Sequence, residues 1–305
     1  MRNDLPHKAI IHETVLRDGI QNEEMIVPTE KKLQLIDHLV GCGIKRIEIS
    51  SFVNPRLVPQ MADAEELWSR IERKEGIIYS ALVLGKKSLD RAIGCGVPHV
   101  GIFVSASETH SRKNSNRSIS EAKEEALELI KRAKSSDMKV RAGVMNAFGC
   151  AYEGGIPPEK VMDLVRDFMG TEPDEICLAD TSGMANPLQM HAMLACLKDI
   201  TEEKPISLHL HNTRGLGLAN VWEALRQGVT IFDTSLGGLG GCPFIPGARG
   251  NIATEDTVHM LCKIGIETGI DIDALIEESL YFEKVIGKEF PAMTSHLKHN
   301  KSSNI

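Results

Sequence analysis

The sequence predicts an α/β fold, a (β/α)8 TIM barrel with an extra C-terminal helix. Eight short β-branched stretches alternate with eight longer amphipathic ones along 305 residues, and no Gly-, Ser- or Pro-rich linker divides them. Such a barrel needs roughly 250 residues. We therefore expect a single catalytic domain over 1–290, followed by a polar, mobile tail over 291–305. An open doubly wound sheet is the alternative, but no Gly-x-Gly-x-x-Gly follows the first strand.

The predicted strands are short runs rich in β-branched and other apolar residues, a composition typical of strands in a parallel sheet. They cover 8–12, 44–50, 77–83, 97–104, 138–145, 174–179, 206–211 and 229–235.

A stretch with helical periodicity follows each strand, and several of these stretches begin with a helix start signal. Ser118 precedes Glu121, and Pro187 follows Asn186. The predicted helices cover 29–42, 60–74, 86–95, 119–136, 158–169, 187–199, 216–227 and 254–267, with the extra helix at 272–288.

Composition restricts the class of partner. The formal net charge is −7, which argues against nucleic acid or an anionic membrane, and no apolar run is long enough to span a bilayer. The seven cysteines are widely spaced and contain no Cys-x-x-Cys, so a disulfide framework or a closed zinc site is not expected. These features predict a cytoplasmic protein with a small-molecule substrate, most of whose cysteines are buried apolar residues.

Four polar residues fall at predicted strand ends, where the active sites of such barrels lie. His209 and His211 alternate along the seventh strand and would face the same side, although an isolated His-x-His is as often structural. Asp18 follows the first strand, and Asn251 follows the eighth. Two imidazoles and two oxygen donors without a thiolate suit Mg²⁺ or Mn²⁺ better than zinc.

Two further residues are candidates for catalysis. Arg17 at the barrel mouth would stabilise a developing oxyanion or enolate, or would only pair with a carboxylate such as Glu48. Cys242 ends the Gly-rich run 237–241, where a thiol can transfer a proton; the alternative is a small residue in a tight turn.

Several motifs, in order along the chain, resemble the hydroxymethylglutaryl-CoA lyases, which belong to the same superfamily as the alkylmalate synthases. The resemblance runs from about residue 8 to about 288. The segments that carry it are 13–23, 47–53 with 58–63, 107–119, 149–154, and 238–244 with 250–256.

This resemblance implies a divalent cation, Mg²⁺ or Mn²⁺, held by Asp18, His209, His211 and Asn251. It implies an acyl-CoA substrate and a homodimer. The reaction implied is the metal-assisted retro-Claisen cleavage of a 3-hydroxy-3-alkyl acyl-CoA to acetyl-CoA and a keto acid such as acetoacetate. The catalytic residues implied are Arg17, Cys242, His209, Asp18, Glu48 and Asp180, with His209 and Asp18 as alternative proton acceptors.

The chain departs from the family pattern at Asn212, Arg214 and Arg249, which we expect, with Gln21 and Arg17, to contact the substrate. The reaction class is therefore better determined than the acyl group. The alternatives are a Claisen-type alkylmalate synthase, a keto-acid aldolase that does not use CoA, and a binding barrel without catalysis. The Gly-Gly-Cys-Pro segment ending at Pro243 favours the lyase over the synthase.

Overall fold

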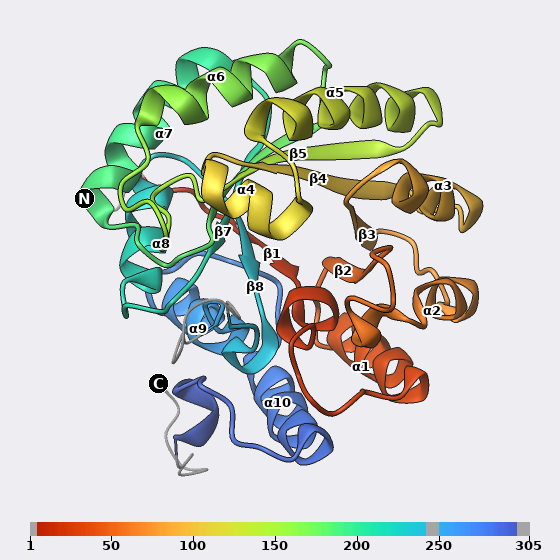
Figure 1. Ribbon diagram of the computed structural model, residues 1–305. Coiled ribbons are helices and arrows are strands. Elements are labelled where there is room, and N and C mark those ends of the chain that lie inside the picture. The colour runs from red at the N-terminus through yellow and green to blue at the C-terminus, as the bar shows by residue number, and fades with distance from the viewer. Residues whose placement is uncertain (1–4, 242–249, 298–305) are drawn as a thin grey trace.

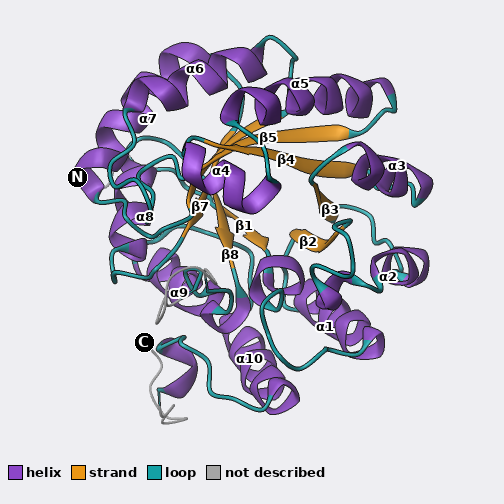
Figure 2. Ribbon diagram, viewed as in Figure 1, coloured by secondary structure: helices purple, strands orange, loops and turns teal. Residues whose placement is uncertain are grey.

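The computed structural model describes residues 5–241 and 250–297. Eight parallel strands form a closed barrel in chain order, in which β1 (Ile10–Glu13) pairs with both β2 (Arg46–Ser51) and β8 (Ile231–Thr234). The helices surround the strands (Figure 2). The predicted (β/α)8 barrel is confirmed.

The remaining strands lie within a few residues of the predicted ones. They are β3 (Ile78–Val83), β4 (His99–Ser105), β5 (Lys139–Met145), β6 (Glu175–Asp180) and β7 (Ile206–Leu210).

The helices also follow the predicted order, with the extra helix α10 after the last barrel helix. They are α1 (Thr29–Gly41), α2 (Ala64–Arg70), α3 (Lys86–Gly94), α4 (Glu108–Ser115), α5 (Ile119–Ser135), α6 (Pro158–Met169), α7 (Pro187–Thr201), α8 (Gly217–Arg226), α9 (Thr254–Lys263) and α10 (Ile272–Ile286).

Three local features differ from prediction. The expected helix over 60–74 is reduced to a 3-10 turn, Pro59–Met61, and α2. Helix α4 lies in a polar segment where no helix was predicted, and Ser107 caps it by accepting a hydrogen bond from the His110 amide. In Figure 1, α4 lies in front of the strands. A π-helical turn, Val15–Gly19, follows β1.

The apolar core lies between the strands and the helices. Outward-facing strand residues such as Ile47, Ile49, Val140 and Leu208 are fully buried there. Several inward-facing positions are instead polar, including His12 and Arg141. Of the six described cysteines, Cys42, Cys150 and Cys177 are buried and the others are partly or fully exposed, so the prediction that most are buried holds for only half of them.

The start of the predicted mobile tail is packed. Residues Thr294–His296 form a 3-10 turn, and the amides of Met293 and Thr294 donate to the Asp256 carboxylate at 3.1 and 2.7 Å. These backbone contacts hold a segment whose sequence lacks any periodic pattern, and residues 298–305 lie outside the described part. The domain boundary at residue 290 stays a prediction.

Candidate active site and metal centre

Three of the predicted metal ligands meet at the carboxyl ends of the strands. Asp18 lies in the π-helical turn after β1, His209 lies in β7, and His211 follows β7. The Nε2 atoms of both histidines lie 3.8 Å from Asp18 Oδ2 and 3.0 Å from each other. Because two imidazole nitrogens and a carboxylate face one centre, this group can hold a metal ion.

Asn251, the fourth predicted ligand, lies beside this group. Its backbone forms a β-bridge with His211, and its Nδ2 donates to Asp18 Oδ2 at 2.7 Å and to the Leu239 carbonyl at 3.0 Å. Its Oδ1 is buried and has no hydrogen-bond partner within 5–241 and 250–297. A buried amide oxygen without a donor fits a cation ligand, so the donor set matches the hard divalent ion that was predicted.

The charges of the cluster favour an anionic Asp18 next to a neutral His211. Burial opposes ionisation of Asp18, but Arg17 and the two histidines outweigh it and hold its pKa well below the ordinary value. Burial, reinforced by His209, lowers the pKa of His211 to about 4. A neutral imidazole and an ionised carboxylate are the forms that bind a metal ion.

Arg17 lies between two carboxylates at the edge of the cluster. Its Nε donates to Glu48 and its Nη1 donates to Asp18. The side chain is buried but lines the cavity at the barrel mouth. Both interpretations of Arg17 are thus compatible with its position, because the ion pair with Glu48 orients a guanidinium that still faces the cavity.

The cavity above the cluster has a volume of about 450 Å³, which suits a small-molecule ligand. Arg17, Asp18, His209 and His211 form one side of it, and the predicted substrate contact Gln21 also lines it. Elsewhere the wall combines apolar side chains with cationic and amide groups. These include Leu57, Leu82, Leu84, Phe103, Met145, His110, Lys113 and Asn114.

The glycine-rich segment after β8 packs directly on the ligands. Gly240 has φ +97°, and a Cβ there would lie 2.6 Å from both Asn251 Nδ2 and the Asp18 carbonyl oxygen. At Gly250 a Cβ would lie 2.0 Å from the Gly240 carbonyl oxygen. Only glycine allows this close approach. Gly241 lines the cavity and accepts a hydrogen bond from Asn22 Nδ2 at 3.0 Å.

Three predicted site residues form hydrogen bonds with loop backbone, and their roles in catalysis or substrate binding stay predictions. Asp180 is buried at the end of β6, and its two oxygens accept from the amides of Met184 and Ala185 at 2.8 and 3.1 Å. Burial raises its pKa to about 6. Its hydrogen bonds therefore stabilise the loop after β6, and it is not among the residues that line the cavity.

Asn212 and Arg214 also lie outside the cavity lining. Asn212 Oδ1 accepts from the Gly217 amide at 3.1 Å, and Arg214 Nη1 donates to the carbonyls of Ser182 and Gly183 at 2.6 and 3.0 Å. Backbone groups of neighbouring loops use these polar side chains, and their contact with a substrate stays a prediction. Cys242 and Arg249 fall outside the described residues.

Sequence reasoning missed a second polar group beneath the cluster. His12 contacts Asp233 and Ser80, and Asp233 in turn contacts His209. Arg141 was not singled out. The sequence did contain a signal for this group. Arg141 in β5 and Asp233 in β8 are charged residues that break the apolar pattern of buried parallel strands.

Similarity to known proteins agrees with this geometry. The sequence matches the HMGL-like family over residues 8–280. The chain belongs to the HMGL-like family. The predicted family and enzyme class are thereby confirmed, and members of this lyase family depend on a metal ion.

Three relatives illustrate the extent of the match to the HMGL-like family. The hydroxymethylglutaryl-CoA lyase of Bacillus subtilis is 40% identical over 287 residues, covering 94% of this chain and 96% of that protein. The human mitochondrial enzyme is 40% identical over 285 residues, covering 93% and 88%. The structure of an HMG-CoA lyase from Acinetobacter baumannii, in complex with coenzyme A and 3-methylmalate, has a TM-score of 0.92 at 38% identity and covers 98% of both chains.

Proposed function

We propose that this chain is a carbon–carbon lyase that cleaves 3-hydroxy-3-methylglutaryl-CoA, or a close 3-hydroxy-3-alkyl analogue, into acetyl-CoA and a keto acid such as acetoacetate. The observation that carries the proposal is the juxtaposition of Arg17 with the Asp18–His209–His211 cluster on one side of the cavity. Membership of the HMGL-like family supports the reaction class.

Asp18, His209, His211 and Asn251 would hold the divalent cation. Mg²⁺ or Mn²⁺ is favoured because the donors are two imidazoles and two oxygens, with no thiolate among the described residues around them. A cation bound there would polarise the tertiary hydroxyl of the substrate and lower its pKa. The neutral His211 and the anionic Asp18 described above suit this role.

Arg17 would act on the charge that bond cleavage creates. When a base removes the proton of the tertiary hydroxyl, the oxygen forms the carbonyl of the keto acid and the C2–C3 bond breaks. The electron pair of that bond moves onto the thioester as an enolate. A guanidinium oriented by Glu48 and facing the cavity would stabilise the negative enolate oxygen. Because this charge develops only along the reaction, Arg17 would contribute to kcat more than to KM.

The cavity wall suits an acyl-CoA. Its apolar part would contact the alkyl group and the thioester chain, while Lys113 and Asn114 on α4 offer a cation and an amide to polar parts of the ligand. Nζ of Lys113 lies 4.0 Å from the centre of the Tyr152 ring, which supports its position. The A. baumannii relative, which was crystallised with coenzyme A, is consistent with this ligand class.

Cys242 would protonate the enolate to give acetyl-CoA, a role that rests on the sequence resemblance. The residue before it, Gly241, lines the cavity. The homodimer and the cytoplasmic location also rest on the sequence. None of the helices within 5–241 and 250–297 is long and apolar enough to cross a membrane.

A substrate panel tests the proposal. The full chain, loaded with Mg²⁺ or Mn²⁺, is given 3-hydroxy-3-alkyl acyl-CoA thioesters and the corresponding free acids, and acetyl-CoA and keto acid are measured by chromatography. We expect equimolar acetyl-CoA and keto acid from at least one thioester, and none after the metal is removed. Cleavage of only the free acids would indicate the aldolase instead, and the absence of any cleavage would leave a binding barrel.

A further inference from the structure

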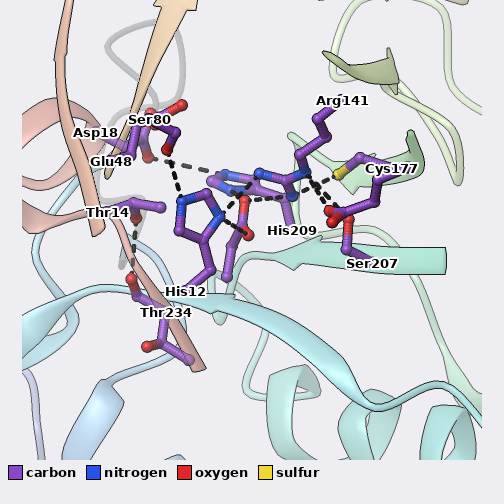
Figure 3. A network of polar contacts seen from close by, with 12 residues as sticks. His12, Thr14, Asp18, Glu48, Ser80, Arg141, Cys177, Ser207, His209 and Thr234 are labelled. Atoms are coloured by element: carbon purple, nitrogen blue, oxygen red, sulfur yellow. Dashed lines mark hydrogen bonds and ion pairs between the residues drawn. The ribbon is translucent and has the colours of Figure 1, made fainter. Parts of the chain in front are cut away.

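A second charged layer lies inside the barrel, below the metal cluster. Asp233 on β8 faces Arg141 on β5 and His12 on β1, and the three side chains are at most 3% exposed. Arg141 Nη2 donates to Asp233 Oδ2 at 2.7 Å, and His12 Nδ1 lies 3.0 Å from Asp233 Oδ1. In Figure 3, His12, Ser80, Arg141 and His209 point toward one another within the barrel.

Stability does not explain this layer. Removing charges from water costs several kcal/mol for each ion, and apolar residues of similar volume often give an equally stable protein. The barrel interior of this fold is commonly filled by branched apolar side chains. A buried guanidinium and carboxylate at these positions therefore need a reason other than the strength of their ion pair.

The reason lies in the contact between Asp233 and the metal cluster. Asp233 Oδ2 lies 3.1 Å from His209 Nδ1, while His209 Nε2 faces Asp18 and His211. A carboxylate paired with a guanidinium accepts hydrogen bonds and does not donate them. His209 Nδ1 must therefore carry the ring proton, which leaves the Nε2 lone pair for the cation.

We propose that Asp233, anchored by Arg141, is the positioning residue that fixes the tautomer and orientation of His209 as a metal ligand. The inference rests on the cation site used in the proposed function, and not on the identity of the substrate. His211 provides a contrast, because its buried Nδ1 has no hydrogen-bond partner in the described part of the chain. Within the described residues, the Asp233 carboxylate thus orients His209, and no comparable group orients His211.

Glu175 on β6 offers a matched control. It is as buried as Asp233 and contacts the same guanidinium, with its Oε1 3.0 Å from Arg141 Nε, and it also pairs with Arg46 at 2.8 Å. It has no contact with His209 among those found in the structure. Replacing it removes a buried charge from the same network without touching the metal ligand.

The test compares Asp233→Asn with Glu175→Gln. Free Mn²⁺ is titrated against metal-free full-length protein and followed by electron paramagnetic resonance, with thermal unfolding recorded by circular dichroism. We expect Asp233→Asn to weaken Mn²⁺ binding by about 10- to 100-fold. The Mn²⁺ affinity of Glu175→Gln should stay within about twofold of that of wild type, because Glu175 does not contact His209. Equal weakening in both variants, or unchanged affinity in Asp233→Asn, would overturn the proposal.

A measurement on the wild-type protein is independent of how well the variants fold. The ¹⁵N spectrum of the histidine side chains is recorded with Mg²⁺ bound, and His209 is assigned by comparison with His209→Gln. We expect a protonated Nδ1 and an unprotonated Nε2. A protonated Nε2 would contradict the inference. Neither experiment contains an acyl-CoA, so each can fail or succeed separately from the proposed reaction.

Discussion

The barrel contains the same group of charges at two depths, an arginine between two carboxylates. At the mouth, Arg17 lies between Glu48 and Asp18; in the interior, Arg141 lies between Asp233 and Glu175. The upper group faces a cavity, whereas the lower group is enclosed on all sides. Under our two proposals, the same arrangement serves catalysis at the mouth, where a ligand can reach it, and orients a metal ligand in the interior, where no ligand can.

The largest effect is expected at the upper arginine. Arg17→Gln removes the charge that would stabilise the enolate, so kcat should fall by roughly a thousandfold, while KM changes much less. Steady-state kinetics of acetyl-CoA release at saturating Mn²⁺ measures both constants. A large rise in KM with kcat preserved would show that Arg17 only binds the substrate.

Loss of a metal ligand should have the next largest effect. His211→Ala removes one of the imidazoles facing Asp18, so Mn²⁺ binding should weaken by more than about 100-fold, beyond the effect of a residue that only supports a ligand. Calorimetric titration of the metal-free protein measures this. His191→Ala, a change at an exposed histidine on α7 that contacts Glu223 on α8, is the control. Wild-type affinity in His211→Ala would remove it from the ligand set.

Glu13 should influence stability through pH. Its Oε1 accepts from the amides of Val15 and Leu236 at 2.9 Å, and burial, together with nearby Glu255, raises its pKa to about 7. Because folding raises this pKa, the folded protein binds a proton at Glu13 more tightly than the unfolded chain does. The stability that this proton contributes is fully present below pH 4.5 and is lost as the pH rises through 7.

Glu13→Gln cannot ionise, so its free energy of unfolding should decline by about 3 kcal/mol less than that of wild type between pH 4 and 8. Urea unfolding across this range measures the difference, with the exposed Glu124→Gln as control. An identical pH dependence in Glu13→Gln and wild type would refute this prediction.

The smallest effect is expected at Arg214, whose side-chain hydrogen bonds within the described residues go to the loop after β6. Arg214→Ala removes two hydrogen bonds to backbone carbonyls and should lower stability by about 1 kcal/mol. The value of kcat/KM should stay within about twofold. A larger loss of kcat/KM at unchanged stability would restore Arg214 to the substrate contacts that the sequence predicted.

The sequence-based predictions succeeded where a local pattern carried the information. Strand and helix periodicity gave the barrel, and strand-end positions brought Asp18, His209 and His211 together. Helix α4 was missed because its residues lack an apolar period, and only its Ser107 cap marked it. The role of Asp233 depends on contacts with β1, β5 and β7, which no spacing along the chain reveals.

We infer that the Arg17 side of the cavity cleaves an acyl-CoA with the help of a divalent cation. Single-turnover cleavage of 3-hydroxy-3-methylglutaryl-CoA or its close analogues by the metal-loaded full chain tests this inference. We expect one acetyl-CoA and one keto acid for each thioester consumed, and almost none in Arg17→Gln. Equal product formation in Arg17→Gln, or in protein stripped of divalent cations, would contradict it.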